Sequence, residues 1–279
     1  MIKSILCAVD GSPYSESVLR NAIYLAKQFD AIIRALTVVD IRLFDWTVAT
    51  GADSFVPVMP SADFQAESQR IQEDKAKKVI DKAGDMLKKE GMNFELKSAA
   101  GIPVDEICDK ARQNDLVVMG IRGEYERWSD KLLGVTLESV SRQISKPLML
   151  VDRNFVEFNH IICGYDGSNS ANKALQLSAF LSKSINLTLD VIMVSDSEEE
   201  RSAVLREAEK YLQPYQISFN LCHDSGDVAD VLVEAQNQSK NKPLIIIGSY
   251  GHSRLREAIL GSTTIQVMRT AKKPIILAK

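Results

Sequence analysis

Cysteine and histidine are scarce in this sequence, and their arrangement gives no sign of a metal site. The 279 residues include four cysteines, which are far apart and form no Cys-x-x-Cys pair. The three histidines, His160, His223 and His252, show no spacing typical of zinc ligands. Cys7 and Cys163 lie inside apolar runs, where cysteine behaves as a small buried hydrophobic residue. The sequence therefore predicts no metal ion held by its own side chains.

Long hydrophobic runs are also absent. No segment approaches the ~20 apolar residues that a membrane-spanning helix needs. The apolar run at residues 5–9 is short and ends in the charged Asp10, unlike a signal peptide. We therefore expect a cytoplasmic protein that makes no contact with a membrane.

Basic residues do not dominate the charge of this sequence, which has 34 Lys and Arg against 37 Asp and Glu. The net charge is −3, and the lysines between residues 75 and 82 are interleaved with Glu73, Asp74 and Asp81. This pattern is typical of a solvated helix face. A nucleic-acid-binding surface would need clustered Lys and Arg instead, so we expect no nucleic-acid partner.

Three common functional motifs are missing. The sequence has no Gly-x-Gly-x-x-Gly dinucleotide fingerprint and no Gly-x4-Gly-Lys-Ser/Thr phosphate loop. It also lacks the Gly-x-Ser-x-Gly turn that exposes a nucleophilic serine. Asp10 and Asp166 each follow an apolar run and could be taken for acyl-phosphate nucleophiles. The glycine-rich segment further along the chain favours ribose contact or helix capping for them instead.

The chain repeats itself. Residues 5–12 (ILCAVDGS) correspond to residues 161–168 (IICGYDGS) at an offset of 156. Further matched blocks follow in the same order: Gly101 with Gly226, Asp105 with Asp230, 116–120 with 244–248, and 146–150 with 273–277. By the last block the offset has fallen to 127, because the second copy lacks most of residues 41–73. This pattern indicates a duplication, with domains at residues 1–153 and 158–279.

Each copy alternates short apolar runs with amphipathic segments. The runs at 5–9, 32–39, 116–119 and 148–151 are rich in β-branched residues, as are strands buried on both faces of a parallel sheet. Apolar residues recur at helical spacing between them, and Ser197 with Glu200 forms a candidate capping box. The pattern predicts an α/β fold of two doubly wound parallel-sheet domains in tandem.

In such sheets a ligand binds outside the carboxyl ends of the strands. One segment there has a distinctive spacing in the second copy: Gly248-Ser249-Tyr250-Gly251, nine further residues, then Gly261-Ser262-Thr263-Thr264 before a helical pattern. Glycines let backbone N–H groups approach a phosphate, and a helix N-terminus adds a positive dipole end. The alternative is that the glycines only make a tight strand-to-helix loop.

Gly-x-x-Gly, nine residues, then Gly-Ser resembles the ATP-binding motif of the universal stress protein family, and both halves of the chain show the likeness. The resemblance implies a five-stranded sheet in each copy, pairing of the two copies through their last strands, and bound ATP with Mg²⁺ on its phosphates. It assigns the ribose to Asp166 and the adenine to the backbone near Val194. The residues it implies around ribose and phosphates are Gly248, Gly251, His252, Gly261, Ser262, Thr263 and Thr264. Tyr165, next to Asp166, departs from the pattern and would either crowd the base or stack on it.

The first copy departs from this motif. Ten residues separate Gly123 from Gly134, and Val135 replaces the hydroxyl residue. The intervening segment brings three carboxylates, Glu124, Glu126 and Asp130, which would repel a triphosphate. Arg122 and Arg127 would offset part of that repulsion, and Thr136 is a substitute hydroxyl. We therefore expect the first copy to have a structural role and not to bind a nucleotide.

Residues 41–64 have no counterpart in the second copy and are apolar and proline-punctuated. They form either a flap over the first copy's site, a surface for a protein partner, or a packing loop, and packing is the expectation because Trp and Phe rarely stay fully exposed.

Three functions fit these observations. The first is a stress-response regulator that binds ATP in its C-terminal domain without efficient catalysis, and this is the reading we favour. The second is a slow ATPase or nucleotide-transfer enzyme, against which no dedicated base or phosphate-binding lysine is evident. The third is a scaffold that binds a protein partner or an apolar ligand.

Overall fold

The computed structural model describes residues 1–43, 62–123, 133–249 and 260–279. The strands of the first repeat are β1 (Ser4–Ala8), β2 (Ile32–Asp40), β3 (Phe94–Gly101), β4 (Leu116–Gly120) and β5 (Leu148–Val151). Its helices are α1 (Pro13–Phe29), α2 (Ala62–Lys89), α3 (Pro103–Ala111) and α4 (Val135–Gln143). A short 3₁₀ turn, Ile41–Leu43, follows β2.

The second repeat has the same order of elements. Its strands are β6 (His160–Gly164), β7 (Thr188–Val194), β8 (Phe219–Asp224), β9 (Pro243–Gly248) and β10 (Ile275–Ala278). Its helices are α5 (Asn169–Ile185), α6 (Glu198–Leu212), α7 (Val228–Gln238) and α8 (Ser262–Thr270), and a 3₁₀ turn, Gln213–Tyr215, follows α6. The alternation of strand and helix confirms the predicted α/β fold.

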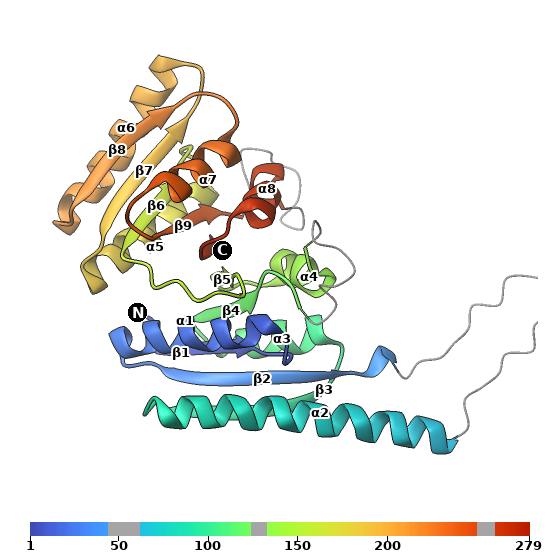
Figure 1. Ribbon diagram of the computed structural model, residues 1–279. Helices are drawn as coiled ribbons and strands as arrows, with labels where there is room; N and C mark the ends of the chain where they lie inside the picture. The colour runs from blue at the N-terminus through green and yellow to red at the C-terminus, as the bar shows by residue number, and fades with distance from the viewer. Residues whose placement is uncertain (44–61, 124–132, 250–259) are drawn as a thin grey trace, which may run out of the picture.

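The ten strands of the described residues join one sheet in the order β3-β2-β1-β4-β5-β10-β9-β6-β7-β8 (Figure 1). Neighbouring strands are parallel within each repeat. The seam between the repeats is the antiparallel pair of β5 and β10, in which Ile276 lies opposite Met149. The second half of the strand order therefore mirrors the first across this seam.

The core has two layers, one on each face of the sheet, and both layers run through both repeats. Helices α1, α2, α5 and α6 cover one face, where Leu25 and Leu181 are fully buried. Helices α3, α4, α7 and α8 cover the other, where Val140 and Val267 are fully buried. The short apolar strands have no solvated face, which explains why their sequences do not alternate with polar residues.

Matched local geometry accompanies the matched sequence. Ser12 and Ser168 each cap the following helix, accepting from the N–H groups of Tyr14 and Ala171. Each serine follows a glycine at positive φ, 80° for Gly11 and 76° for Gly167, a conformation that costs glycine little. The two repeats therefore use the same strand-to-helix turn.

The connection between the repeats is tied to the first one. Phe158 is fully buried, and its ring meets Tyr24 edge-on with 4.9 Å between centroids. The Tyr24 hydroxyl donates to the Phe158 carbonyl at 2.9 Å. Farther along the same layer, Phe29 of α1 stacks on Phe180 of α5 with 5.7 Å between centroids. These aromatic contacts join the helical layers of the two repeats.

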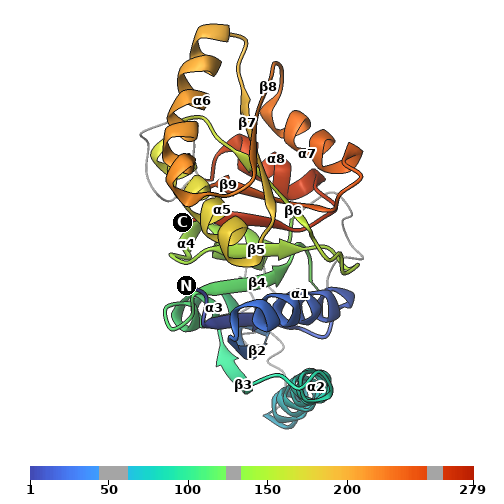
Figure 2. The same ribbon diagram turned by 90° about the vertical axis from the view of Figure 1, so that its left-hand side faces the viewer.

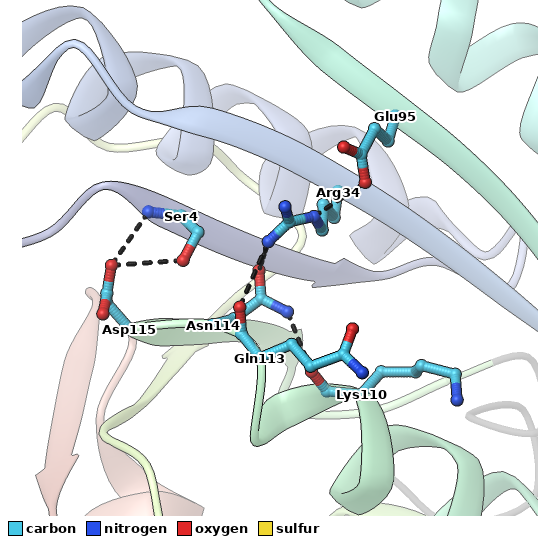
Figure 3. A network of polar contacts seen from close by, with 7 residues as sticks. All are labelled: Ser4, Arg34, Glu95, Lys110, Gln113, Asn114 and Asp115. Atoms are coloured by element: carbon cyan, nitrogen blue, oxygen red, sulfur yellow. Dashed lines mark hydrogen bonds and ion pairs between the residues drawn. The ribbon is translucent and has the colours of Figure 1, made fainter.

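A polar network closes the amino edge of the first repeat's sheet (Figure 3). The Asp115 carboxylate, ahead of β4, accepts from the N–H groups of Lys3 (2.8 Å) and Ser4 (3.0 Å) and from the Ser4 hydroxyl (3.1 Å). Arg34 of β2 donates to Glu95 of β3 at 2.7 Å. Burial of the Asp115 carboxyl raises its pKa, but the hydrogen bonds from Lys3 and Ser4 outweigh this and hold the pKa below its ordinary value.

We expect Phe158→Ala to lower the free energy of unfolding by about 3–5 kcal/mol, because it empties a fully buried site between the repeats. Urea denaturation followed by circular dichroism measures the change. Phe155→Ala, on the same connection but only half-buried, is the matched control and should cost less. Equal losses for the two variants would contradict the anchoring role of Phe158.

We expect Asp115→Asn to lower the free energy of unfolding at pH 7 by about 1–2 kcal/mol, because the amide loses the charge-assisted bonds. The folded pKa of Asp115 is depressed, so its contribution is present above the unfolded value and is lost as pH falls below about 4. The difference in free energy of unfolding between the wild type and the variant should therefore shrink as pH falls through the folded pKa. A difference that stays constant throughout a pH series on the acid side of neutrality would contradict this role of Asp115.

Candidate functional site

The strand order gives two topological switch points at carboxyl ends of strands, one in each repeat. In the second repeat β6 lies between β7 and β9, so the chain leaves β6 and β9 in opposite directions. Ligands bind at such switch points in doubly wound sheets. The residues that follow β6, the end of β9 and the start of α8 therefore lie at one edge of the sheet.

Most of the residues predicted for the site lie at this edge. Asp166 follows β6, Val194 is the last residue of β7, Gly248 is the last residue of β9, and Gly261 to Thr264 begin α8. Gly251 and His252 lie outside the described residues. Figure 2 shows α8 beside β9, on the side of the sheet that also carries α7.

The start of α8 differs from the starts of the other helices in this repeat. Side chains of Ser168, Ser197 and Asp227 accept hydrogen bonds at the N-termini of α5, α6 and α7. The N-cap of α8 is Gly261, which makes no side-chain capping bond. The first N–H groups of any helix have no partner within the helix. Helix α8 thus directs amides and a positive dipole end at the edge of the sheet without a side-chain cap.

Two hydrogen bonds fix this helix start to the end of β9, and a third joins the ends of β9 and β10. The Thr264 hydroxyl donates to the Gly248 carbonyl at 3.1 Å, and the Gly261 N–H donates to the Ser249 carbonyl at 3.3 Å. The Ser249 hydroxyl donates to the Ala278 carbonyl at 2.6 Å. Thr264 and Ser249 are both buried, and their hydroxyls hold the start of α8 and the end of β9 in place. Ser262 is exposed and Thr263 half-buried, which leaves these two side chains nearer to solvent.

The glycines of the motif are required to different degrees by the structure around them. A Cβ on Gly248 would come within 2.4 Å of the Ser170 hydroxyl and 2.7 Å of its carbonyl carbon, so α5 packs too closely for any side chain. Gly120 of the first repeat is constrained in the same way by Tyr14, at 2.6 Å. Gly261 has φ −62° and ψ 147°, an extended conformation open to any residue. Its backbone conformation therefore does not require glycine.

Asp166 is held in a tight turn after β6. Its carboxylate accepts from the Ser168 N–H at 3.0 Å, and the side chain is half-buried. Asp10 makes the same contact with Ser12 at 2.9 Å in the first repeat and also accepts from the Ser15 hydroxyl at 3.1 Å. Each carboxylate keeps part of its surface at the edge, where hydroxyl groups of a ligand can donate to it.

Tyr165 does not project from the edge of the sheet. Its side chain is 3% exposed and belongs to the core under α5 and α6. The hydroxyl donates to Asn172 at 2.8 Å, and burial raises the pKa of this phenol above its ordinary value, with Glu207 adding to the shift. The ring thus bridges two helices instead of standing over the site.

The first repeat has a cavity of about 410 Å³ at the corresponding edge. Its apolar walls include Leu36, Val38, Ile107, Met119 and Leu137. Its charged lining consists of Asp10, Asp40, Lys75 and Arg122. The Arg42 guanidinium donates to both oxygens of Asp40, at 2.9 and 2.6 Å, and holds the pKa of that carboxyl below its ordinary range.

This cavity brings in residues that the sequence pattern did not single out, chiefly Gln72 and Lys75 of α2. Only the packing of α2 against β2 places them there, so no local motif marks them. Val135 at the first turn of α4 is 81% exposed, where the second repeat has Ser262. Residues 124–132, with the three carboxylates noted above, lie outside the described residues.

The described residues contain neither a metal-binding cluster nor a helix suited to a membrane. No group of three or more His, Cys, Asp or Glu side chains there is placed to hold a metal ion. None of the helices in the described ranges combines the length and apolar character that crossing a bilayer requires.

Comparisons with known proteins agree with this architecture. The universal stress protein Slr1230 of Synechocystis sp. is 27% identical over 285 residues, which cover 99% of each chain. A crystal structure of a universal stress protein from Archaeoglobus fulgidus has a TM-score of 0.76 at 23% identity and covers 99% of this chain and 98% of its own. A functionally unknown protein from Pseudomonas aeruginosa, PA1789, has a TM-score of 0.66 at 15% identity, with coverage of 100% and 92%.

The model of the universal stress protein family matches two segments, residues 1–152 and 197–279. The first segment holds the whole of the first repeat, and the second holds α6 to β10 of the second repeat. The duplication, the mirrored strand order and these matches lead to one assignment: the chain belongs to the universal stress protein family, with the family's fold present twice.

Proposed function

We propose that the protein binds ATP, with Mg²⁺ on its phosphates, in the second repeat and acts as a regulator without efficient catalysis. The observation that carries this proposal is the start of α8, where Gly261 leaves the helix without a side-chain cap at the carboxyl edge of the sheet. A phosphate group is the natural partner of such a helix start.

The other groups at this edge suit the remaining parts of a nucleotide. The Asp166 carboxylate can accept from ribose hydroxyls, and the backbone at the end of β7, near Val194, can meet the adenine. The phosphates would lie over Gly261 and Ser262. The Mg²⁺ ion would be held by the phosphates themselves, since the described residues offer no cluster of metal ligands.

Regulation fits this site better than turnover does. Phosphate transfer requires charge stabilisation and a placed nucleophile, together worth several kcal/mol of the barrier. The sequence has no Gly-x4-Gly-Lys-Ser/Thr loop, so the lysine that such loops direct at the terminal phosphates is missing. A bound nucleotide regulates only if it binds two states of the protein with different affinity.

A second candidate is nucleotide binding in the first repeat, favoured by one observation. The cavity of about 410 Å³ there lies within the size range of small-molecule sites and has Lys75 and Arg122 in its lining. Val135 in place of the hydroxyl residue and the longer loop between Gly123 and Gly134 disfavour a triphosphate at this position.

We expect Gly261→Val to abolish ATP binding, because the branched side chain would occupy the space of a phosphate. The extended conformation of Gly261 accepts valine, so the fold should survive. Gly134→Val is the matched control: an added Cβ there meets only ordinary contacts of 3.8 Å and more. Isothermal titration should give one ATP per chain in the wild type and in Gly134→Val. Loss of binding in Gly134→Val alone would assign the nucleotide to the first repeat.

We expect ATP that is carried through purification, or added with Mg²⁺, to remain a triphosphate over hours. Mass spectrometry of the protein as purified identifies the nucleotide, and anion-exchange chromatography of timed samples follows its fate. Phosphate release above the level of the Gly261→Val variant would show catalysis. A purified protein without nucleotide and without an ATP-induced melting shift would favour the scaffold alternative.

A further inference from the structure

A groove of about 1020 Å³ runs between α1 and α2 on one face of the first repeat. In Figure 1 these two helices run along the sheet, with β2 visible between them. The groove begins at the turn of Gly11 and Ser12 and ends near Phe155 and Glu157 of the connection between the repeats. It follows the length of α1, which spans 17 residues. At a rise of about 1.5 Å per residue, this is roughly 25 Å.

The floor of the groove is apolar. Leu19 and Ile23 of α1 and Val79 and Met86 of α2 line it. Leu19 and Ile23 belong to the buried core, and Val79 and Met86 are only partly buried. An apolar strip thus lies open along the channel between the two helices.

The wall formed by α2 is cationic. Lys75, Lys78, Lys82 and Lys89 line the groove, whereas Glu73, Asp74 and Asp81 of the same helix do not. Lysine spacings of three, four and seven place these side chains on one face of a helix. The folded helix therefore separates charges that look interleaved in the sequence.

The opposite wall is close to neutral. Arg20 pairs with Glu16 at 2.8 Å, and Lys27 pairs with Glu90 at 2.6 Å. Of the other two carboxylates in the lining, Asp85 belongs to α2 itself and Glu157 to the connection between the repeats. The groove as a whole carries an excess of positive charge, contributed by the lysines of α2.

The second repeat uses the same space differently. Tyr165 stands at the position of Val9, and its hydroxyl donates to Asn172 of α5 and interacts with Glu207 of α6. Val9 has neither ring nor hydroxyl, so this position makes no such hydrogen-bonded bridge in the first repeat.

The charges of the two repeats differ at this place too. Val79 packs beside Gly11 as Val204 packs beside Gly167, which aligns α2 with α6. This alignment puts Glu200 and Glu207 where Lys75 and Lys82 stand. The open cationic groove is therefore a feature in which the first repeat has diverged from the second.

We propose that the α1–α2 groove of the first repeat binds an amphipathic helix of a partner protein, with apolar residues on the floor and Asp or Glu beside the lysines of α2. A concave channel about as long as α1 suits a helix laid between two helices. A flat lipid surface cannot reach its floor. The proposal does not depend on nucleotide binding in the second repeat.

A designed peptide tests the groove directly. The probe is a fluorescein-labelled helix of 18 residues with Leu at i, i+3, i+4 and i+7 spacing and Glu at the flanking positions. Fluorescence anisotropy with the full chain should show saturable binding that weakens as salt is added. A matched peptide with Lys in place of Glu should bind at least about tenfold more weakly, a difference of about 1.4 kcal/mol.

Variants of the protein locate the contact. Lys78→Glu with Lys82→Glu should weaken binding of the acidic peptide by at least about tenfold. Lys77→Glu is the matched control, because Lys77 is exposed on the same helix but is not part of the groove lining. It should leave the affinity within about twofold.

A second variant tests the apolar channel. Val9→Tyr introduces the bridging residue of the second repeat and should abolish peptide binding, while thermal melting by circular dichroism verifies the fold. The proposal is overturned if both peptides bind equally, or if Lys77→Glu weakens binding as much as the double variant. Binding of anionic vesicles without binding of the acidic peptide would also overturn it. So would a concentration-dependent self-association of the protein that Val9→Tyr abolishes, because the groove would then bind a second copy of this chain.

Discussion

The antiparallel pairing of β5 with β10 is the constraint on which the rest of the structure depends. It joins two five-stranded parallel sheets into one, and the residues of both strands are fully or almost fully buried. Beyond β10, the Lys279 side chain donates to the carbonyl of Ser141 in α4, and burial lowers the pKa of its ammonium group to about 8. Because the strands are antiparallel here, the carboxyl ends of the two halves point in opposite directions across the seam. Each repeat therefore has its own carboxyl edge, at which a ligand of this fold would bind.

The two repeats of this joined sheet have the same strand-to-helix turns but different polar side chains at equivalent positions. The capping serines and the positive-φ glycines are equivalent in both. At the amino edge, Arg34 of β2 pairs with Glu95, whereas the equivalent strand of the second repeat carries Asp190, which bonds His160 at 2.6 Å and Asn220 at 2.7 Å. Equivalent positions of the two repeats thus carry residues of opposite charge, and each residue has its own partners. Backbone geometry tolerates such exchanges as long as every buried polar group finds a partner.

The sequence predicted the strands well because buried parallel strands have a distinctive composition. The expected runs at 5–9 and 148–151 correspond to β1 (Ser4–Ala8) and β5 (Leu148–Val151). The capping box at Ser197 formed only in part. Ser197 accepts from the Glu200 N–H at 3.2 Å, but the Glu200 carboxylate accepts from the Ser195 hydroxyl. The second bond of the box, between the Glu200 carboxylate and the Ser197 N–H, is replaced by contacts of both groups with the Ser195 hydroxyl, which the Ser-x-x-Glu spacing does not predict. The same holds for the lysines of α2, because their common face emerges only when the helix packs on the sheet.

The glycine motif shows how far spacing alone can carry an argument about function. Gly248 is required by the approach of Ser170, and Gly120 by Tyr14, so these glycines would be needed without any ligand. Thr264 looked like a phosphate donor, yet its hydroxyl already holds the Gly248 carbonyl. Backbone conformation does not account for Gly261, because its φ and ψ admit other residues, and the helix that it begins has no side-chain cap. In the first repeat Gly134 has the same conformation, φ −60° and ψ 134°, and again no side-chain cap. The physical case for a phosphate therefore rests on the uncapped start of a helix, a feature that both repeats retain. The residue that follows it, Ser262 or Val135, is where they differ.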